Sequence, residues 1–178
     1  ASLHQRAYRQ ETGDAPLKEH IASAMLMRSG WTENTDAPLV DLMCGSGTIA
    51  IEAAYIARNI APGIKRMYWG FTKWLGHEEK LWDDLVEQAI SVQKPSCSGI
   101  YAGDFSRKMV AIAKANADFA GVFNDISFSQ QDATKSSPPV STPGYVVSNP
   151  PYGERLGELT SLIPLFSDWG KRFKEAWK

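Results

Sequence analysis

Short apolar runs alternate with stretches of helical periodicity along most of the chain. The apolar runs predict four β-strands, at residues 39–42, 99–104, 126–130 and 145–148. Apolar side chains at helical spacing predict helices at residues 14–29, 48–58, 78–93, 106–120 and 157–178. Strands that alternate with helices pair in parallel, so the pattern predicts an α/β fold with a doubly wound sheet. Such sheets bind ligands at the carboxyl ends of their strands.

Composition and charge narrow the classes of protein that fit. With 43% hydrophobic and 22% charged residues, the composition is typical of a globular protein. Apolar runs fall short of the roughly 20 residues that span a bilayer, and the start of the chain lacks a secretory signal pattern. Cys44 and Cys97 form neither a disulfide framework nor a zinc site, which favours a reducing cytoplasm. A net charge of −1 means that any nucleic acid would be held mainly by a local patch or another domain.

A glycine turn follows the first predicted strand, with the sequence D-L-M-C-G-S-G-T from Asp41 to Thr48. Gly45 and Gly47 allow the backbone to approach a ligand closely. The pattern is neither G-x-G-x-x-G nor a phosphate-binding P-loop. It resembles the first motif of class I methyltransferases, in which the acid helps to hold the cofactor's ammonium end. The alternative is a tight strand-to-helix turn with no ligand.

Two further acids follow predicted strands. Asp104 ends the second strand, where a carboxylate can accept hydrogen bonds from both hydroxyls of a ribose. Alternatively, it caps the helix that begins near Ser106. Asp132 follows the third strand and either starts a turn or, as in the resembled fold, accepts from the cofactor's adenine amino group. The Ala133 backbone or the Phe105 ring would complete that adenine pocket.

The segment after the fourth strand carries the most specific motif, S-N-P-P-Y at residues 148–152. An exocyclic amine of a base is a poor nucleophile, because its lone pair is delocalised into the ring. The Asn149 side-chain oxygen and the Pro150 carbonyl can accept both amino hydrogens and aim the lone pair at a methyl donor. Tyr152 can stack on a base swung out of its helix, which is worth about 1–3 kcal/mol. The motif therefore predicts methyl transfer by alignment and electrostatic stabilisation, without a metal or a general-base histidine, rather than a merely structural Pro-rich loop.

The remaining candidates are less specific. Residues 69–82 are rich in tryptophan, and we expect a satellite core there rather than a base-stacking platform. The three histidines are expected to be surface or packing residues. Candidate phosphate contacts are Arg6, Arg9, Lys65, Arg66 and Arg155, against the alternative of ordinary solvated charge.

Over nearly its whole length the chain resembles the THUMP-associated RNA methyltransferases. The resemblance rests on residues 3–9 and 15–19, the glycine motif, the tryptophan segment of 61–82, and the run S-N-P-P-Y-G-E-R-L at 148–156. It is greatest to the bacterial branch that methylates guanine N2 in large-subunit (23S) ribosomal RNA. The resemblance implies a class I, Rossmann-like fold with strand order 3-2-1-4. It also implies S-adenosylmethionine as methyl donor, S-adenosylhomocysteine as product and ribosomal RNA as substrate.

The resemblance further implies roles for individual residues. It assigns the target guanine to Asn149, Pro150 and Tyr152. It assigns the cofactor to Lys18, Glu19, Asp41, Cys44, Gly45, Gly47, Thr48, Asp104, Phe105, Asp132, Ala133 and Asn149, with Pro16 beside the first two at the carboxylate end. A metal ligand is not expected. One departure is Ser106, which stands where the family often has a second ribose acid.

Domain organisation follows from the same resemblance. Residues 1–13 are expected to be a linker from an upstream RNA-binding THUMP region, and residues 14–178 to be the methyltransferase domain. That domain would carry an aromatic insertion at 59–98 and lack the last strands of its sheet, which would leave the fourth strand as an open edge. The first residue is Ala, which also suggests a piece of a longer protein. The expected partner is ribosomal RNA, naked or in an early assembly intermediate, gripped mainly by the THUMP region, with no membrane.

Four other functions fit part of the pattern. Adenine-N6 or cytosine-N4 methylation of DNA or RNA would use Asn-Pro-Pro-Tyr equally well, and methylation of a protein glutamine would hold the amide in the same way. An inactive RNA-binding module could retain the fold. A nicotinamide enzyme would share the sheet but bind NAD instead of S-adenosylhomocysteine.

Overall fold

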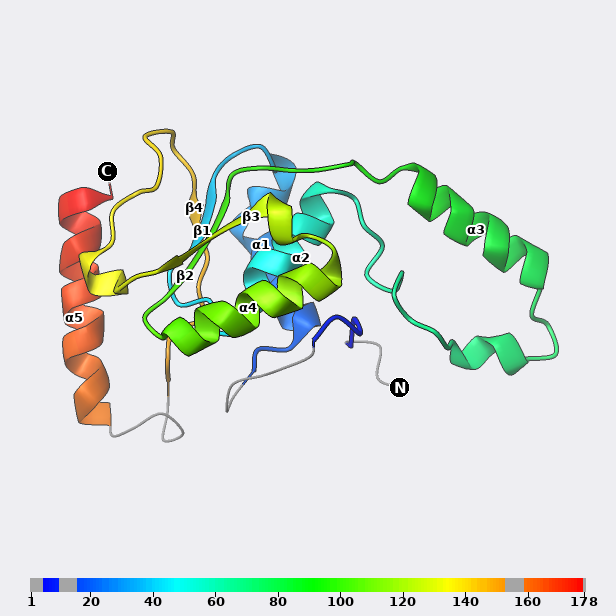
Figure 1. Cartoon of the computed structure of the whole chain (residues 1–178), viewed down its shortest axis with the longest axis horizontal. Helices are drawn as coiled ribbons and strands as arrows, with labels where there is room; N and C mark the ends of the chain where they lie inside the picture. The colour runs from blue at the N-terminus through cyan, green and yellow to red at the C-terminus, as the bar shows by residue number, and fades with distance from the viewer. Residues whose placement is uncertain (1–4, 10–15, 153–158, 178) are drawn as a thin grey trace.

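Four parallel strands form the centre of the molecule (Figure 1). The computed structural model describes residues 5–9, 16–152 and 159–177. The strands are β1 (Leu39–Asp41), β2 (Ile100–Asp104), β3 (Ile126–Gln130) and β4 (Tyr145–Val146), in the order β3-β2-β1-β4. Ile100 of β2 pairs with Leu39 on one side and Ile126 on the other. The predicted α/β class and strand order are confirmed, and β4 is an edge strand of the described sheet.

Helices cover the two faces of the sheet unequally. The α-helices are α1 (Glu19–Ser29), α2 (Thr48–Ala57), α3 (Glu79–Ser91), α4 (Arg107–Ala120) and α5 (Leu159–Ala176). Short 3-10 turns lie at η1 (Trp31–Glu33), η2 (Gly70–Lys73), η3 (Phe123–Asp125) and η4 (Ala133–Lys135). Helices α1, α2 and α4 share the main hydrophobic core with the sheet, whereas α5 packs on η4 and the opposite face.

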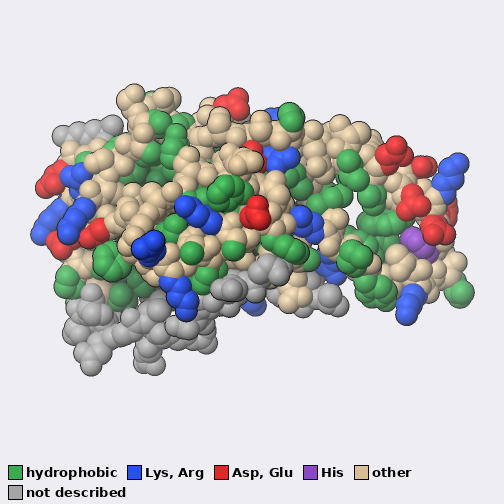
Figure 2. All heavy atoms as spheres, viewed as in Figure 1, with side chains coloured by type: hydrophobic (Ala, Val, Ile, Leu, Met, Phe, Trp, Pro, Cys, Tyr) green, Lys and Arg blue, Asp and Glu red, His purple; other side chains and the backbone are tan. Residues whose placement is uncertain are grey.

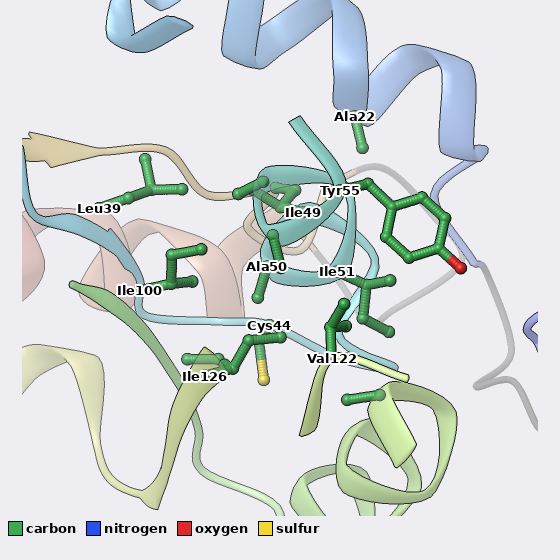
Figure 3. Close-up of a cluster of buried hydrophobic side chains, with 14 of the residues drawn as sticks. Ala22, Leu39, Cys44, Ile49, Ala50, Ile51, Tyr55, Ile100, Val122 and Ile126 are labelled. Carbon is green, nitrogen blue, oxygen red and sulfur yellow. The ribbon is translucent and has the colours of Figure 1, made fainter. Parts of the chain in front are cut away.

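Alternating side chains of β1 explain the two cores. Leu39 joins the main core, and its neighbour Val40 points to the other face, where α5 packs. Apart from Thr48 and Glu52, the side chains of helix α2 are apolar, as expected of a helix in the middle of the main core (Figure 3). On the second face Trp169 and Phe173 of α5 pack against Val40 and Leu42.

Most predicted element ends lie within a few residues of the observed ones, and one helix start is wrong. The first helix begins at Glu19 rather than at residue 14, with Lys18 in extended conformation at its N-terminus. The Leu17 carbonyl accepts a hydrogen bond of 2.6 Å from Arg9, which holds that residue outside the helix. The proposed cap Asp14 lies outside the described residues. Gly30 ends this helix in left-handed conformation, as predicted.

The segment predicted to be an insertion, residues 59–98, extends away from the sheet and ends in η2 and α3 at the right of Figure 1. We call this segment the insertion. None of the thirteen described residues of α3 is buried. Trp69, Phe71 and Trp82 nevertheless form a local aromatic cluster, with ring centroids 4.8–5.7 Å apart. The expected satellite core is therefore present, although it is small and partly exposed. No helix in the described part of the chain is long and apolar enough to cross a membrane.

Candidate functional site

Polar side chains converge where the four parallel strands end. Asp41 and Asp104 are the last residues of β1 and β2, Asp132 comes two residues after β3, and Asn149 comes three after β4. Because all four strands run the same way, these positions share one edge of the sheet, on the lower side of Figure 1. These four predicted site residues are thus brought to one edge from positions up to 108 residues apart in the sequence (Asp41 to Asn149).

Asp41 is buried beneath the loop that follows β4. Its Oδ1 accepts hydrogen bonds from the Ser148 hydroxyl at 2.5 Å and from the Met43 amide at 3.2 Å. Burial raises the pKa of Asp41 to about 7, although both hydrogen bonds oppose the shift. The charge of Asp104 is a smaller contribution in the same direction as burial. A cation placed against Asp41 would lower this pKa and favour the ionised acid.

Of the two glycines in the turn, only Gly47 is closely packed against a neighbouring helix. Gly45 has φ of +52°, and a Cβ there would meet nothing within 4 Å, so its outer side is open. Its amide donates a 2.9 Å hydrogen bond to Asp104 Oδ2. Gly47 has φ of +85°, and a Cβ there would lie 3.0 Å from the Cβ of Ala113 on α4. Gly47 is therefore required for packing, and Gly45 for the turn itself.

The two other predicted residues of this turn point their side chains inward. Cys44 is buried in the main core, and burial raises the pKa of its thiol, so the thiol stays neutral. The Thr48 hydroxyl is also buried and accepts from Arg9 at 3.1 Å. Contacts of Cys44 with a ligand would therefore be made by its backbone.

Asp104 is not the cap of α4, because Ser106 is its N-cap and accepts from the Met109 amide. Oδ1 of Asp104 accepts from the Ser106 amide at 2.8 Å, just before the helix, and Oδ2 accepts from the Gly45 amide at 2.9 Å. The next residue, Phe105, exposes 76% of its side chain. A large exposed ring next to a carboxylate is suited to a purine nucleoside, because the acid can bind the ribose and the ring can pack on the base.

Asp132 is partly exposed and lies at the start of η4. It accepts from the amide and hydroxyl of Thr134, at 2.9 and 2.6 Å. The Thr134 hydroxyl is the main cause of a lowered pKa for Asp132. Ala133 is buried against Val40 and Leu42. Asp132 therefore starts a turn, which is one of the two roles predicted from sequence. Its carboxylate remains ionised, as an acceptor for the adenine amino group would need to be.

The Asn-Pro-Pro-Tyr segment lies directly after the last sheet contact of β4, in which the Val147 amide donates to the Val40 carbonyl at 3.0 Å. Asn149 and Pro150 are half-buried, whereas Tyr152 exposes 67% of its side chain. This ring is therefore available for stacking. The G-E-R-L extension, with Arg155, lies outside the described residues.

Two of the arginines predicted to contact phosphate have internal partners instead. Arg6 forms an ion pair of 3.4 Å with Glu52, and Arg9 forms one of 3.5 Å with Glu19. Their side chains are only 12% and 16% exposed. The interpretation of Arg6 and Arg9 as phosphate contacts is therefore wrong. Arg6 joins the described N-terminal segment, residues 5–9, to α2, and Arg9 joins it to α1.

Sequence reasoning missed Glu52, which organises this junction. The carboxylate lies in the otherwise apolar α2 and is 2% exposed. It accepts from Tyr8 at 3.0 Å and from Ser23 at 2.5 Å, besides pairing with Arg6. Burial raises its pKa, and these partners lower it. The signal in the sequence was a lone acid inside an apolar helix, which has to be paired.

A cleft of about 670 Å³ opens beside this junction. We call it the N-terminal cleft; its lining residues are Gln5, Ala7, Arg9, Pro16, Lys18, Glu19, Arg66, Met67 and Tyr68. The predicted cofactor residues Lys18 and Glu19 lie in its wall, and its lining residues do not include the Asn149 segment. Among the described residues, no group of three His, Cys, Asp or Glu side chains is placed to hold a metal ion. His20 is exposed and His77 packs on Phe71, while His4 lies outside the described part.

Comparison with known proteins shows the family. The family model described as "RMKL-like, methyltransferase domain" matches residues 6–178. The chain belongs to this family of RMKL-like methyltransferase domains.

Solved structures of methyltransferases superpose on the chain, which confirms the expected class I methyltransferase fold. The SMU.472 protein, complexed with SAH, is 36% identical with a TM-score of 0.87, over 97% of this chain and 44% of that one. A possible methylase from Clostridium difficile 630 is 37% identical with a TM-score of 0.88, over 98% of this chain and 45% of that one.

Curated relatives are more similar in sequence and much longer. The ribosomal RNA large subunit methyltransferase K/L of Alteromonas mediterranea is 95% identical over 100% of this chain. The protein of the same name from Pseudoalteromonas atlantica is 58% identical, also over the whole chain. In both cases the chain spans 26% of the relative's length. A predicted N6-adenine-specific DNA methylase from Listeria monocytogenes is a further solved neighbour, 36% identical with a TM-score of 0.83, over 98% of this chain and 45% of that one.

Proposed function

We propose that this chain binds S-adenosylmethionine at the carboxyl edge of its sheet and transfers the methyl group to N2 of a guanine in large-subunit ribosomal RNA. The observation that carries the proposal is the convergence of Asp41, Asp104, Asp132 and Asn149 at the ends of four parallel strands. Support comes from the neighbour complexed with SAH and from the relatives named ribosomal RNA large subunit methyltransferase K/L.

The three acids suit the three polar parts of the cofactor. Asp41 would hold the ammonium group, whose positive charge would lower the raised pKa of this acid and keep it ionised. Asp104 would exchange its hydrogen bond from the Gly45 amide for the ribose hydroxyls, while Phe105 packs on the adenine. Asp132, already ionised, would accept from the adenine amino group.

The Asn-Pro-Pro-Tyr segment would supply the chemistry. The Asn149 oxygen and the Pro150 carbonyl accept the two amino hydrogens, so that the nitrogen lone pair points at the methyl carbon. The nitrogen–methyl bond forms as the sulfur–methyl bond breaks. The positive charge of the sulfonium would pass to the nitrogen, which would then lose a proton to solvent water, and S-adenosylhomocysteine would leave. The rate gain comes from alignment of two bound partners and from the oxygens that face the charge developing on nitrogen.

The larger organisation is part of the same proposal. Residues 14–178 would form the methyltransferase domain with the insertion, and residues 1–13 would lead from an RNA-binding THUMP region. The reaction would take place in the cytoplasm on naked or partly assembled ribosomal RNA, without a metal ion.

Adenine N6 is the second candidate target. The same two acceptors fit any exocyclic amine, and the Listeria monocytogenes neighbour is named as a predicted N6-adenine-specific DNA methylase. Ribosomal RNA is preferred to DNA as the substrate because the relatives at 58% and 95% identity are named for ribosomal RNA. The choice of guanine N2 rests on the sequence resemblance to the branch that methylates this position.

Identification of the methylated nucleoside tests the proposal. The full-length protein containing this chain is incubated with methyl-labelled S-adenosylmethionine and large-subunit ribosomal RNA lacking the modification, and the digested RNA is analysed by mass spectrometry. Label in N2-methylguanosine is expected, with ribosomal RNA that already carries the modification as the unlabelled control. Label in N6-methyladenosine would support methyl transfer to RNA, but it would show that the target base is adenine and not guanine. Binding of S-adenosylhomocysteine without transfer to RNA would overturn the substrate.

A further inference from the structure

Ser148, the residue just before the Asn-Pro-Pro-Tyr segment, continues the contact between β1 and β4 where their backbone pairing ends. The last described backbone hydrogen bond between these strands runs from the Val147 amide to the Val40 carbonyl, at 3.0 Å. One residue further along each strand the contact is made by side chains, because the Ser148 hydroxyl donates to Asp41 Oδ1 at 2.5 Å. The hydroxyl therefore connects the buried acid at the end of β1 with the start of the segment after β4.

Ser148 also contacts the backbone of the glycine turn. Its oxygen accepts a hydrogen bond of 3.2 Å from the Met43 amide, and the same amide donates to Asp41 Oδ1 at 3.2 Å. The hydroxyl, the carboxylate oxygen and the backbone amide thus form a closed ring of three hydrogen bonds. Rotation of the half-buried Ser148 side chain would break two of them at once. The ring therefore fixes the start of the Asn149 segment against the turn.

This ring leaves one oxygen of Asp41 for a ligand. Both hydrogen bonds that Asp41 accepts from the described residues end on Oδ1, and Oδ2 accepts none from them. Each carboxylate oxygen can accept further donors, so Oδ2 suits the ammonium group that the proposed function assigns to this acid. Ser148 thereby determines how Asp41 is oriented, while its own backbone leads directly into Asn149.

The charge state of Asp41 depends on the same hydrogen bond. Asp41 is 2% exposed, and burial is the main cause of its raised pKa. The hydrogen bond from Ser148 has the largest effect in the opposite direction, ahead of the Met43 amide. Among the described residues, the titratable groups that interact with Asp41 are Asp104 on β2, whose charge raises this pKa, and the Cys44 thiol, which burial keeps neutral. Ser148 is thus the side chain that most favours the ionised form of Asp41.

We propose that Ser148 is a positioning residue, which fixes Asp41 and Asn149 relative to each other so that the cofactor's ammonium group and the target amine are aligned. This inference rests on the proposed function, because it assumes that Asp41 meets the cofactor and Asn149 the target base. Ser148 acts through these two neighbours. Loss of its hydroxyl should therefore disturb both cofactor binding and transfer, whereas loss of the Asn149 side chain should disturb transfer alone.

Two variants of the full-length protein test the proposal, Ser148→Ala and Ser148→Thr, of which the second keeps the hydroxyl. The affinity for S-adenosylhomocysteine is measured from about pH 6 to about pH 8, and kcat is measured with unmodified large-subunit ribosomal RNA at about pH 8. In Ser148→Ala the fall in affinity towards low pH should begin at a higher pH, because Asp41 loses the hydrogen bond that favours its charge. The loss relative to wild type should be about tenfold at about pH 6, as for one hydrogen bond to a charged group, and smaller at about pH 8. We expect kcat to fall at least about tenfold, because Asn149 is less well aligned, and Ser148→Thr to restore both quantities.

Ser91→Ala is the matched control. It also removes a hydroxyl, which donates to the Gln88 carbonyl at 2.8 Å within α3. This helix lies at the right of the molecule, where acidic and hydrophobic side chains are exposed together (Figure 2). The control should match wild type in kcat and, at each pH, in affinity.

An unchanged pH profile of affinity in Ser148→Ala would overturn the inference, and an unchanged kcat would overturn the link to Asn149. A loss that Ser148→Thr fails to restore would also contradict it, because the hydroxyl would then not be the cause. Absence of transfer by the wild-type protein would instead show that the proposed function has failed, while the affinity profiles would still decide whether Ser148 acts on Asp41.

Discussion

The sheet with its flanking helices and the insertion use the same kinds of residue in opposite ways. Trp31 is fully buried in the main core and donates to the Ala37 carbonyl at 2.8 Å, whereas Trp74 of the insertion exposes 73% of its side chain. Glu52 of α2 is buried among three partners, whereas Glu87 of α3 is exposed. The sheet region therefore depends on a closely packed interior, and the insertion depends little on burial. Candidate catalytic residues belong to the first region, where their positions are fixed.

The largest stability difference is expected between the two glutamates. Glu52→Ala leaves the Arg6 guanidinium without its carboxylate in the interior, so we expect a loss of about 3–5 kcal/mol in the free energy of unfolding. Glu87→Ala removes an exposed charge and should change it by less than about 0.5 kcal/mol. Urea unfolding of both variants measures the difference. A loss below about 1 kcal/mol for Glu52→Ala would show that the buried network does not hold the N-terminal segment.

The pH dependence of stability should reveal the buried acid of the site. Asp41 has a pKa raised to about 7 by burial, so between about pH 4 and 7 the folded protein keeps a proton that the unfolded chain has lost. Its contribution to stability is therefore full below about pH 4 and disappears as pH rises through 7. Asp41→Asn should remove a decrease of about 4 kcal/mol across this window, measured by urea unfolding at several pH values.

Asp132→Asn is the control for that measurement. The pKa of Asp132 is lowered, so its contribution is present above the ordinary pKa of an aspartate and is lost only as pH falls through the lowered value. The stability difference between wild type and Asp132→Asn should accordingly be flat from pH 5 to pH 8. An equal change in the free energy of unfolding with pH in Asp41→Asn and Asp132→Asn would contradict the assignment of Asp41 as the buried acid with the raised pKa.

The glycines of the two regions should differ more modestly. Gly47→Ala places a Cβ 3.0 Å from Ala113 in left-handed backbone, which should cost about 1–2 kcal/mol. Gly70, in the insertion, has open space around its Cβ position and no positive φ, so Gly70→Ala should be close to neutral. Thermal unfolding compares them, and equal melting temperatures would show that the glycine turn is not tightly packed.

The smallest effect is expected from the exposed tryptophan. Trp74→Ala should change the free energy of unfolding by less than about 0.5 kcal/mol and leave methyl transfer unaltered, because its ring is mostly in solvent. Circular dichroism melts and the RNA assay measure both quantities. A loss above about 1 kcal/mol would mean that the insertion is a structural part of the sheet region.

Much of the fold could be predicted from sequence, because each strand and helix carries its own pattern. Apolar runs separated by amphipathic helices determine a parallel sheet, and Gly30 and Gly121 both end their helices as expected. Since parallel strands end at one edge, the sequence alone predicts that the acids at the ends of β1 and β2 and after β3 lie together.

Contacts between distant segments could not be predicted in the same way. Arg6 and Arg9 look like free cations in a linear sequence, and only the fold brings them to Glu52 and Glu19, of which the first is 46 residues away. The same is true of the N-terminal cleft, whose walls come from the N-terminal segment and the insertion. The start of α1 was misplaced because the Arg9 contact, which holds Leu17, is also a tertiary one.

The most direct test of the proposed site separates cofactor binding from transfer in Asn149→Ala. The control is Asn124→Ala, which makes the same change at an exposed position in η3, at the opposite end of β3. If Asn149 holds the target amine, its replacement should lower methyl transfer to ribosomal RNA at least about hundredfold and leave the affinity for S-adenosylhomocysteine within about twofold. The control should match wild type in both measurements. Full transfer by Asn149→Ala would contradict the account, because the methyl group would then reach its target without the segment after β4.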